Sequence, residues 1–225
     1  MNLINIKPYL DLLLLGALTT VALLICALTL GLLAALFLVV SDALWPRLLK
    51  FPINIFVFVI RGTPLLVQFF LIYFGSSQFA WIRESILWVV LKKPFGCAML
   101  ALAINTCAYT VVLLRGAIKS IPKGEVEAAH ALGKSRFLLL RKIVVPRAFR
   151  IALPAYSNEV IMVLQGTSLA STITLLDLMG MTQRVIAQTY AAIEFLIVAG
   201  VIYFIMNALI MMAFRMLENR YRVVM

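Results

Sequence analysis

The chain has 225 residues, of which 64% are hydrophobic and 13% are charged. Soluble domains hold about 45–50% apolar and about 25% charged residues. The composition therefore excludes a soluble enzyme, a disordered chain and a collagen-like chain, and indicates a multi-pass membrane protein. The net charge of +11 would suggest a nucleic-acid partner in a soluble domain, but in a membrane protein such charge is first assigned to the loops.

Five apolar runs are long enough to cross a bilayer. A hydrocarbon core of about 30 Å needs about 20 helical residues. We therefore expect an all-α integral membrane protein with five transmembrane helices, forming a single transmembrane domain over residues 1–225. The runs are Leu12–Val40, Phe51–Phe74, Pro94–Leu114, Ile151–Leu176 and Phe195–Phe214.

The second run is interrupted by the sequence Arg61–Pro64. Proline has no N–H and would clash with the carbonyl of Ile60, so a helix must kink or begin there. Transporters use broken helices at membrane depth to present the backbone to substrate. Thr63, and Gln68 one turn further on, are therefore candidate residues of a substrate pathway. In the alternative interpretation, residues 51–60 lie at the membrane interface and the arginine extends its charge into water.

The fourth run contains one charge, Glu159. A charge at the bilayer centre costs about 2.5–3.5 kcal/mol, so such a residue usually faces the bundle interior and has a partner or a pathway role. With Asn158 beside it, the carboxylate suits a cationic side chain or an α-ammonium group. The alternative is an ion pair or hydrogen bond to another helix, for instance to Arg61.

Basic residues are distributed unevenly between the alternate loops. Residues 41–50, 115–150 and the C-terminal tail contain 14 Lys and Arg, whereas the other extramembrane segments contain 5. The positive-inside rule places the basic set in the cytoplasm and the N-terminus outside. This distribution explains the net charge without a nucleic-acid partner. The three cysteines lie in apolar runs without a CxxC motif or a histidine cluster, so we expect buried thiols, no metal site and no cofactor.

The large basic loop contains the sequence Gly133-Lys134-Ser135. A phosphate-binding loop would need glycine at position 128, which is alanine, so nucleotide binding is not expected. The local signals predict two short helices, separated at Gly133 and ended by Pro146. Their basic face would suit either a partner protein or the anionic inner leaflet.

The spacing in residues 119–147 resembles the EAA loop of permease subunits of binding-protein-dependent ABC transporters. The matching positions are Glu127, Ala128, Ala129, Gly133, Ile143 and Pro146. Three further blocks resemble the polar amino-acid branch of this family: Arg61–Gln68, Asn105–Thr110 and Ser157–Val160. Residues 167–177 look most like the arginine-type and the histidine/lysine/arginine/ornithine-type members.

The resemblance implies a permease of the type I ABC importer fold in the bacterial plasma membrane, with a cytoplasmic coupling-helix loop at residues 119–147. Its substrate would be arginine or another cationic amino acid, and a separate subunit would hydrolyse ATP. A dimer of ATP-binding cassette subunits would dock at Glu127, Ala128, Ala129 and Gly133, and an extracytoplasmic binding protein would deliver the amino acid. Alternatives are a permease for glutamine or histidine, or an ATP-independent channel.

One position departs from the family pattern. Many relatives carry an acid where this chain has Val112. The substitution removes a polar group from the third span, which favours pairing with a second, non-identical permease subunit.

Overall fold

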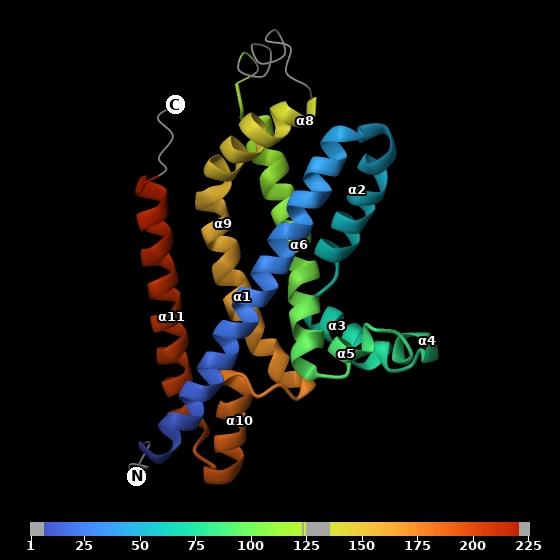
Figure 1. Ribbon diagram of the computed structural model, residues 1–225. Helices are drawn as coiled ribbons and strands as arrows, with labels where there is room; N and C mark the ends of the chain where they lie inside the picture. Colours follow the sequence, from blue (N-terminus) through green and yellow to red (C-terminus); the bar gives the residue numbers. More distant parts are fainter. Residues whose placement is uncertain (1–6, 123, 125–135, 221–225) are drawn as a thin grey trace.

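The computed structural model describes residues 7–122, 124 and 136–220, and this part of the chain contains helices and no strand (Figure 1). Three helices are individually long and apolar enough to cross a membrane: α1 (Lys7–Leu44), α6 (Pro94–Lys119) and α11 (Ala192–Arg220). Two bent pairs raise the possible number of spans in the described chain to five. The five spans expected from the sequence are the upper limit of this range.

The first bent pair follows α1. It consists of α2 (Pro46–Gly62) and of α3 (Leu65–Phe70) with its π-helical continuation η1 (Leu71–Gly75), and the two parts are bent by 105°. The short helices α4 (Ala80–Arg83) and α5 (Trp88–Leu91) then connect η1 to α6. The kink expected from Pro64 is therefore present.

The second bent pair begins after the basic loop. The short helix α8 (Arg136–Leu139) and the π-helix η2 (Leu140–Val144) continue into α9 (Val145–Thr167) and the 3-10 helix η3 (Ser168–Ile173). A bend of 48° separates this continuous helical segment from α10 (Leu178–Thr189).

The expectation that Pro146 ends a helix was wrong. Pro146 lies in the first turn of α9, and the chain is helical on both sides of it. The ring of a helical proline clashes with the carbonyl four residues earlier, which here belongs to Lys142 in η2. The π-helical turn at that point accommodates the proline, since such bulges relax the regular hydrogen-bond ladder.

Local sequence explains where the other helices begin and end. Pro46 and Pro94 occupy the first turns of α2 and α6, where a missing N–H is harmless. Asp177 caps α10, because its Oδ1 accepts a hydrogen bond of 2.9 Å from the Gly180 N–H. Tyr190, with a φ of 58°, ends that helix in a left-handed conformation.

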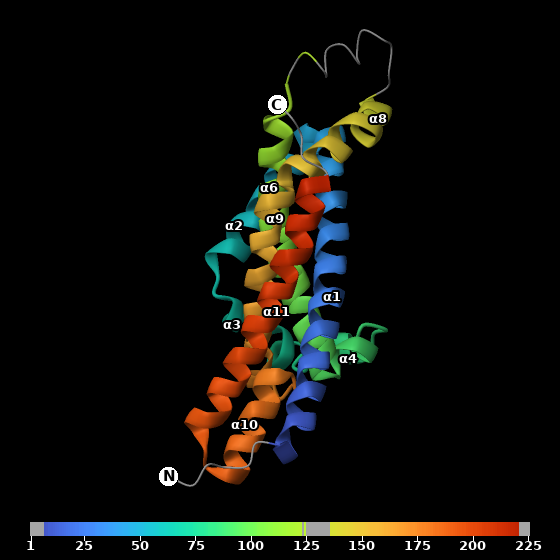
Figure 2. The ribbon, with the colours of Figure 1, turned by 90° about the vertical axis from the view of Figure 1, so that its left-hand side faces the viewer.

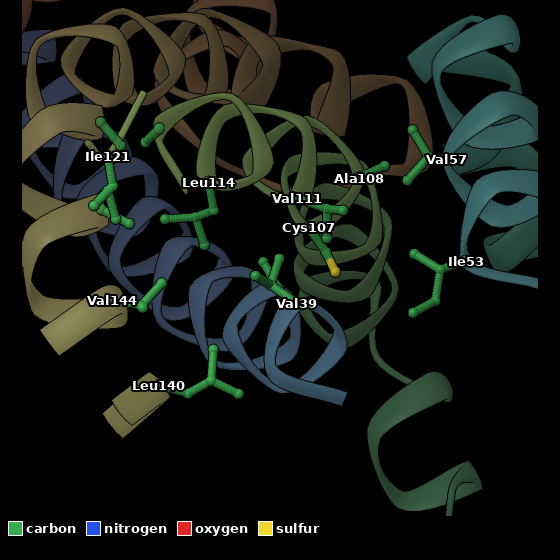
Figure 3. Close-up of a cluster of buried hydrophobic side chains, with 14 of the residues drawn as sticks. Val39, Ile53, Val57, Cys107, Ala108, Val111, Leu114, Ile121, Leu140 and Val144 are labelled. Carbon is green, nitrogen blue, oxygen red and sulfur yellow. The ribbon is translucent and has the colours of Figure 1, made fainter. Parts of the chain in front are cut away.

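Helices α1, α6 and α9 form the centre of the bundle, and small residues allow α1 and α6 to approach closely. Gly31 on α1 faces Thr106 and the carbonyl of Ala103 on α6, with no space for a Cβ. Close approach through small residues is typical of helix packing in membranes. Figure 3 shows side chains from α1, α2, α6 and η2 gathered in one apolar cluster around Cys107.

The cysteines agree largely with expectation. All three are free, and Cys97 and Cys107 are buried, whereas Cys26 is half-buried.

The two ends of the bundle are formed by different elements. The start of α1 and helix α10 lie at one end, and α8 and the last residues of α11 lie at the other (Figures 1 and 2).

Candidate functional site

The break between α2 and α3 is formed by two extended residues. Thr63 has φ −108° and ψ 138°, and Pro64 has φ −60° and ψ 136°. A residue before proline is pushed towards the extended region, so α2 cannot continue through Thr63. The two residues turn the chain sharply and expose the last carbonyls of α2.

Two of the predicted pathway residues provide hydrogen bonds for these carbonyls. The Thr63 hydroxyl lies 3.0 Å from the Val59 oxygen, to which it donates. The amide Nε2 of Gln68 donates to the Ile60 oxygen at 2.8 Å and to the Thr63 oxygen at 3.1 Å. Gln68 is only 6% exposed. Since a helix end buried without partners is costly, these two side chains stabilise the break.

Helix α6 holds the broken segment in place from the other side. Asn105 Nδ2 donates to Gln68 Oε1 at 3.1 Å, and the Arg61 guanidinium lies 4.9 Å from the centroid of the Tyr109 ring. The second contact is a cation–π interaction. Leu102, Asn105 and Tyr109 are three and four residues apart, so they share one face of α6.

Glu159 reaches the same region from α9 and is 7% exposed. Among the described residues, no basic nitrogen lies within ion-pair distance of its carboxylate. Arg61 nevertheless lines the same cavity as this carboxylate. The direct ion pair with Arg61 that the sequence left open is therefore not formed.

These elements border an open-sided cavity of about 340 Å³. Its volume lies within the range of about 300–1,000 Å³ that is usual for small-molecule sites. It is lined by Arg61, Gly62, Thr63, Pro64, Leu65, Leu102, Asn105, Tyr109, Glu159, Met162 and Val163. One guanidinium and one carboxylate thus face the same space, a combination that complements the two charges of an amino-acid zwitterion.

The structure brings together three of the four predicted pathway residues. Thr63 and Glu159 line the cavity, and Gln68 lies behind its wall, bonded to Thr63. Asn158 does not join them, because it is exposed on α9 and outside the lining.

Sequence reasoning did not single out Asn105 and Tyr109 as site residues. Both belong to the cavity lining. The available signal was an amide and a tyrosine four residues apart in an apolar run. The predicted coupling residues lie outside the described residues: Glu127, Ala128, Ala129 and Gly133.

Comparison with known proteins identifies the family. Residues 27–223 match the family described as binding-protein-dependent transport system inner membrane component. The chain belongs to this family. The resemblance inferred from the EAA-like spacing is therefore confirmed, as is the all-α fold of a type I importer permease.

The permease has named relatives along most of its length. It is 43% identical over 214 residues to the arginine ABC transporter permease protein ArtM of Haemophilus influenzae, covering 95% of this chain and 94% of ArtM. It is 40% identical over 207 residues to the histidine/lysine/arginine/ornithine transport system permease protein HisM of Escherichia coli, covering 92% and 87% of the two chains.

A solved structure agrees with this fold. The crystal structure of an amino acid ABC transporter with histidines matches with a TM-score of 0.85 and 31% identity, covering 98% of the permease and 99% of that chain.

Proposed function

We propose that this permease conducts arginine or another cationic amino acid through the cavity at the α2–α3 break, in an importer driven by a separate ATPase. The observation that supports this most is Glu159, a buried carboxylate that faces the cavity and has no ion-pair partner in the described part of the chain. The names of the relatives, which refer to arginine and to histidine, lysine, arginine and ornithine, support the same substrate class.

The cavity offers complementary groups for such a substrate. The carboxylate of Glu159 would attract the guanidinium or ammonium group of the side chain, since hydrogen bonds between charged groups are the strong ones. The Arg61 guanidinium, held against Tyr109, would receive the substrate carboxylate. Thr63 and Asn105 line the site directly, and Gln68, bonded to both, holds the break in position.

The ATPase would act at the α8 end of the bundle. Helix α6 finishes at this end and α8 begins there (Figure 1), so the intervening residues are tethered to both. We propose that Glu127, Ala128, Ala129 and Gly133 contact a dimer of ATP-binding cassette subunits. Motion of this loop would pass directly into α6 and α9, which both contribute side chains to the cavity lining.

The α8 end is proposed to be cytoplasmic. Arg115 and Lys119 lie near the end of α6, and Arg215 and Arg220 lie near the end of α11. Basic residues concentrate on the cytoplasmic side of membrane proteins. The start of α1 and α10 would then be extracytoplasmic, where a binding protein delivers the amino acid.

A second permease subunit would complete the pathway, and we propose that it is not identical to this one. Val112 is packed against the apolar cluster that contains Cys107, so this chain supplies no acid at that position. Within the described lining of the cavity, Glu159 is the only acidic side chain. A different subunit could contribute a second one.

Reconstituted transport tests the proposal. The permease would be incorporated into proteoliposomes with its ATPase, its partner permease and its binding protein, and uptake of labelled arginine measured with and without ATP. We expect ATP-dependent uptake that unlabelled lysine or ornithine inhibits. Flux without ATP would support a channel instead, and inhibition by glutamine alone would contradict the cationic substrate.

A further inference from the structure

Residues 76–93, here named the α4–α5 segment, expose large apolar side chains away from the bundle. Ile86 is 86% exposed and Trp81 is 67% exposed. Four others in the segment are also exposed: Phe79, Leu87, Val89 and Val90. Large exposed apolar side chains concentrated in one segment indicate a contact with membrane or protein.

The segment has few attachments to the rest of the chain. Near its C-terminal end, the Cys97 thiol donates to the Leu91 oxygen at 3.0 Å, and Val90 packs against Gly96. Helices α4 and α5 have only four residues each. Helices this short are not stable in isolation, so they depend on their surroundings, which for α5 include the packing of Leu91 against a buried apolar cluster.

Its position indicates which environment this is. The segment connects the end of η1 at Gly75, the second half of the first bent pair, to the start of the membrane-spanning helix α6 at Pro94. Figure 1 shows α4 projecting sideways from the bundle. In Figure 2, α4 lies beyond α1, whereas the α2–α3 break lies at the opposite edge. In Figure 1, both α3 and α4 lie to the right of α6, so the segment and the second half of the broken span share one side of the bundle in that view.

The charges of the segment also suit a lipid surface. Arg83, Lys92 and Lys93 are exposed, against one exposed acid, Glu84. Tryptophan is enriched at membrane–water interfaces, and basic residues beside an apolar surface bind anionic phospholipid headgroups.

We propose that the α4–α5 segment lies flat in the interfacial layer of the bilayer at the α10 end. Trp81 and Ile86 would enter the boundary between headgroups and acyl chains, and Arg83, Lys92 and Lys93 would contact phosphate groups. The occupant of this surface is thus lipid. The inference requires the chain to be inserted in a membrane and does not depend on the transported substrate.

Spin labelling tests this placement. Ile86→Cys would be labelled with a nitroxide in a variant whose Cys26, Cys97 and Cys107 are alanine, within the transporter assembled from cysteine-free partners in lipid nanodiscs. Relaxation of the label by oxygen, which partitions into lipid, is compared with relaxation by a nickel chelate, which stays in water. Gln188→Cys, at an exposed polar position of α10, is the matched control at the same end of the bundle.

We expect the oxygen-to-nickel ratio at position 86 to exceed that at position 188 several-fold. A ratio equal to that of the control would place the segment in water and overturn the proposal. Protection from both reagents would show that a protein covers it, which would also overturn the proposal. Val89→Cys, on the same exposed surface, provides a second reading if the first variant assembles poorly.

Discussion

Arg115 Nη2 on α6 lies 2.7 Å from Asp42 Oδ2 near the end of α1. Its Nη1 donates to Asn54 Oδ1 on α2, also at 2.7 Å. One side chain therefore connects three helices, four residues before α6 ends at Lys119. We expect α1, α2 and α6 to move as one body when the adjoining loop is displaced, which would carry the α2–α3 break with them.

Removing this connection should destabilise the bundle. Charge-assisted hydrogen bonds contribute about 1.5–3 kcal/mol, and the Arg115 and Asp42 side chains are only 24% and 19% exposed. We predict that Arg115→Ala lowers the melting temperature in detergent, measured by the reaction of a thiol-specific dye with the cysteines as they become exposed. Arg184→Ala, at an exposed position of α10, should leave it unchanged.

The same pair allows a thermodynamic cycle. Because contacting residues are energetically coupled, the double variant Asp42→Asn/Arg115→Ala should be more stable than the sum of the two single losses predicts. Simple additivity would contradict a direct interaction between Arg115 and Asp42.

Gln68 provides a test of how the break is stabilised. Gln68→Leu keeps the approximate size but removes the donor to the Ile60 and Thr63 oxygens. The Ile60 oxygen keeps the Thr63 hydroxyl as a partner at 3.2 Å, but losing a donor to a part-buried carbonyl costs about 1–3 kcal/mol. We predict a lower melting temperature and slower arginine uptake. Asn105→Ala removes only the bond to Gln68 and should lower the melting temperature and the uptake rate less than Gln68→Leu does. A larger loss for Asn105→Ala than for Gln68→Leu would contradict this account.

Close packing of α1 on α6 gives a matched pair of glycine variants. A Cβ at Gly31 would meet Thr106 Cγ2 and the Ala103 oxygen, whereas a Cβ at Gly200 on α11 meets nothing within 4 Å. Overpacking costs about 1–3 kcal/mol. Gly31→Ala should therefore lower the melting temperature, and Gly200→Ala should change it little. Equal melting temperatures for the two variants would contradict the close approach.

The coupling loop can be tested by association with the ATPase. Gly133→Asp should abolish co-purification of the ATPase from membranes while leaving insertion of the permease normal. Gly124→Asp is the control, because Gly124 faces open space and acidic residues are tolerated at a helix start. Unchanged co-purification by Gly133→Asp would exclude these residues as the contact.

Sequence patterns could predict the apolar runs and the kink, since hydropathy and the missing proline N–H are local properties. They could also single out Glu159, because a charge within a span is conspicuous. The side-chain partners were beyond such reasoning. Gln68 turns back to the carbonyls of α2, and Arg61 stacks on Tyr109 and does not pair with Glu159. Both arrangements depend on how α6 packs against the break. The prediction that Pro146 ends a helix failed for a related reason. The π-helical turn before it, which accommodates the proline, cannot be predicted from the amino-acid composition.

The central claim is that the Glu159 carboxylate contacts a cationic substrate in the cavity. Glu159→Gln removes the charge and preserves the shape, and Glu194→Gln, at an exposed position of α11, is the charge-matched control. The decisive measurement is the initial rate of ATP-dependent arginine uptake into proteoliposomes containing equal amounts of assembled transporter. Loss of about 1.5–3 kcal/mol of interaction predicts that uptake falls about tenfold or more at low arginine concentration for Glu159→Gln and is unchanged for Glu194→Gln. Normal uptake with unaltered selectivity by Glu159→Gln would contradict the claim.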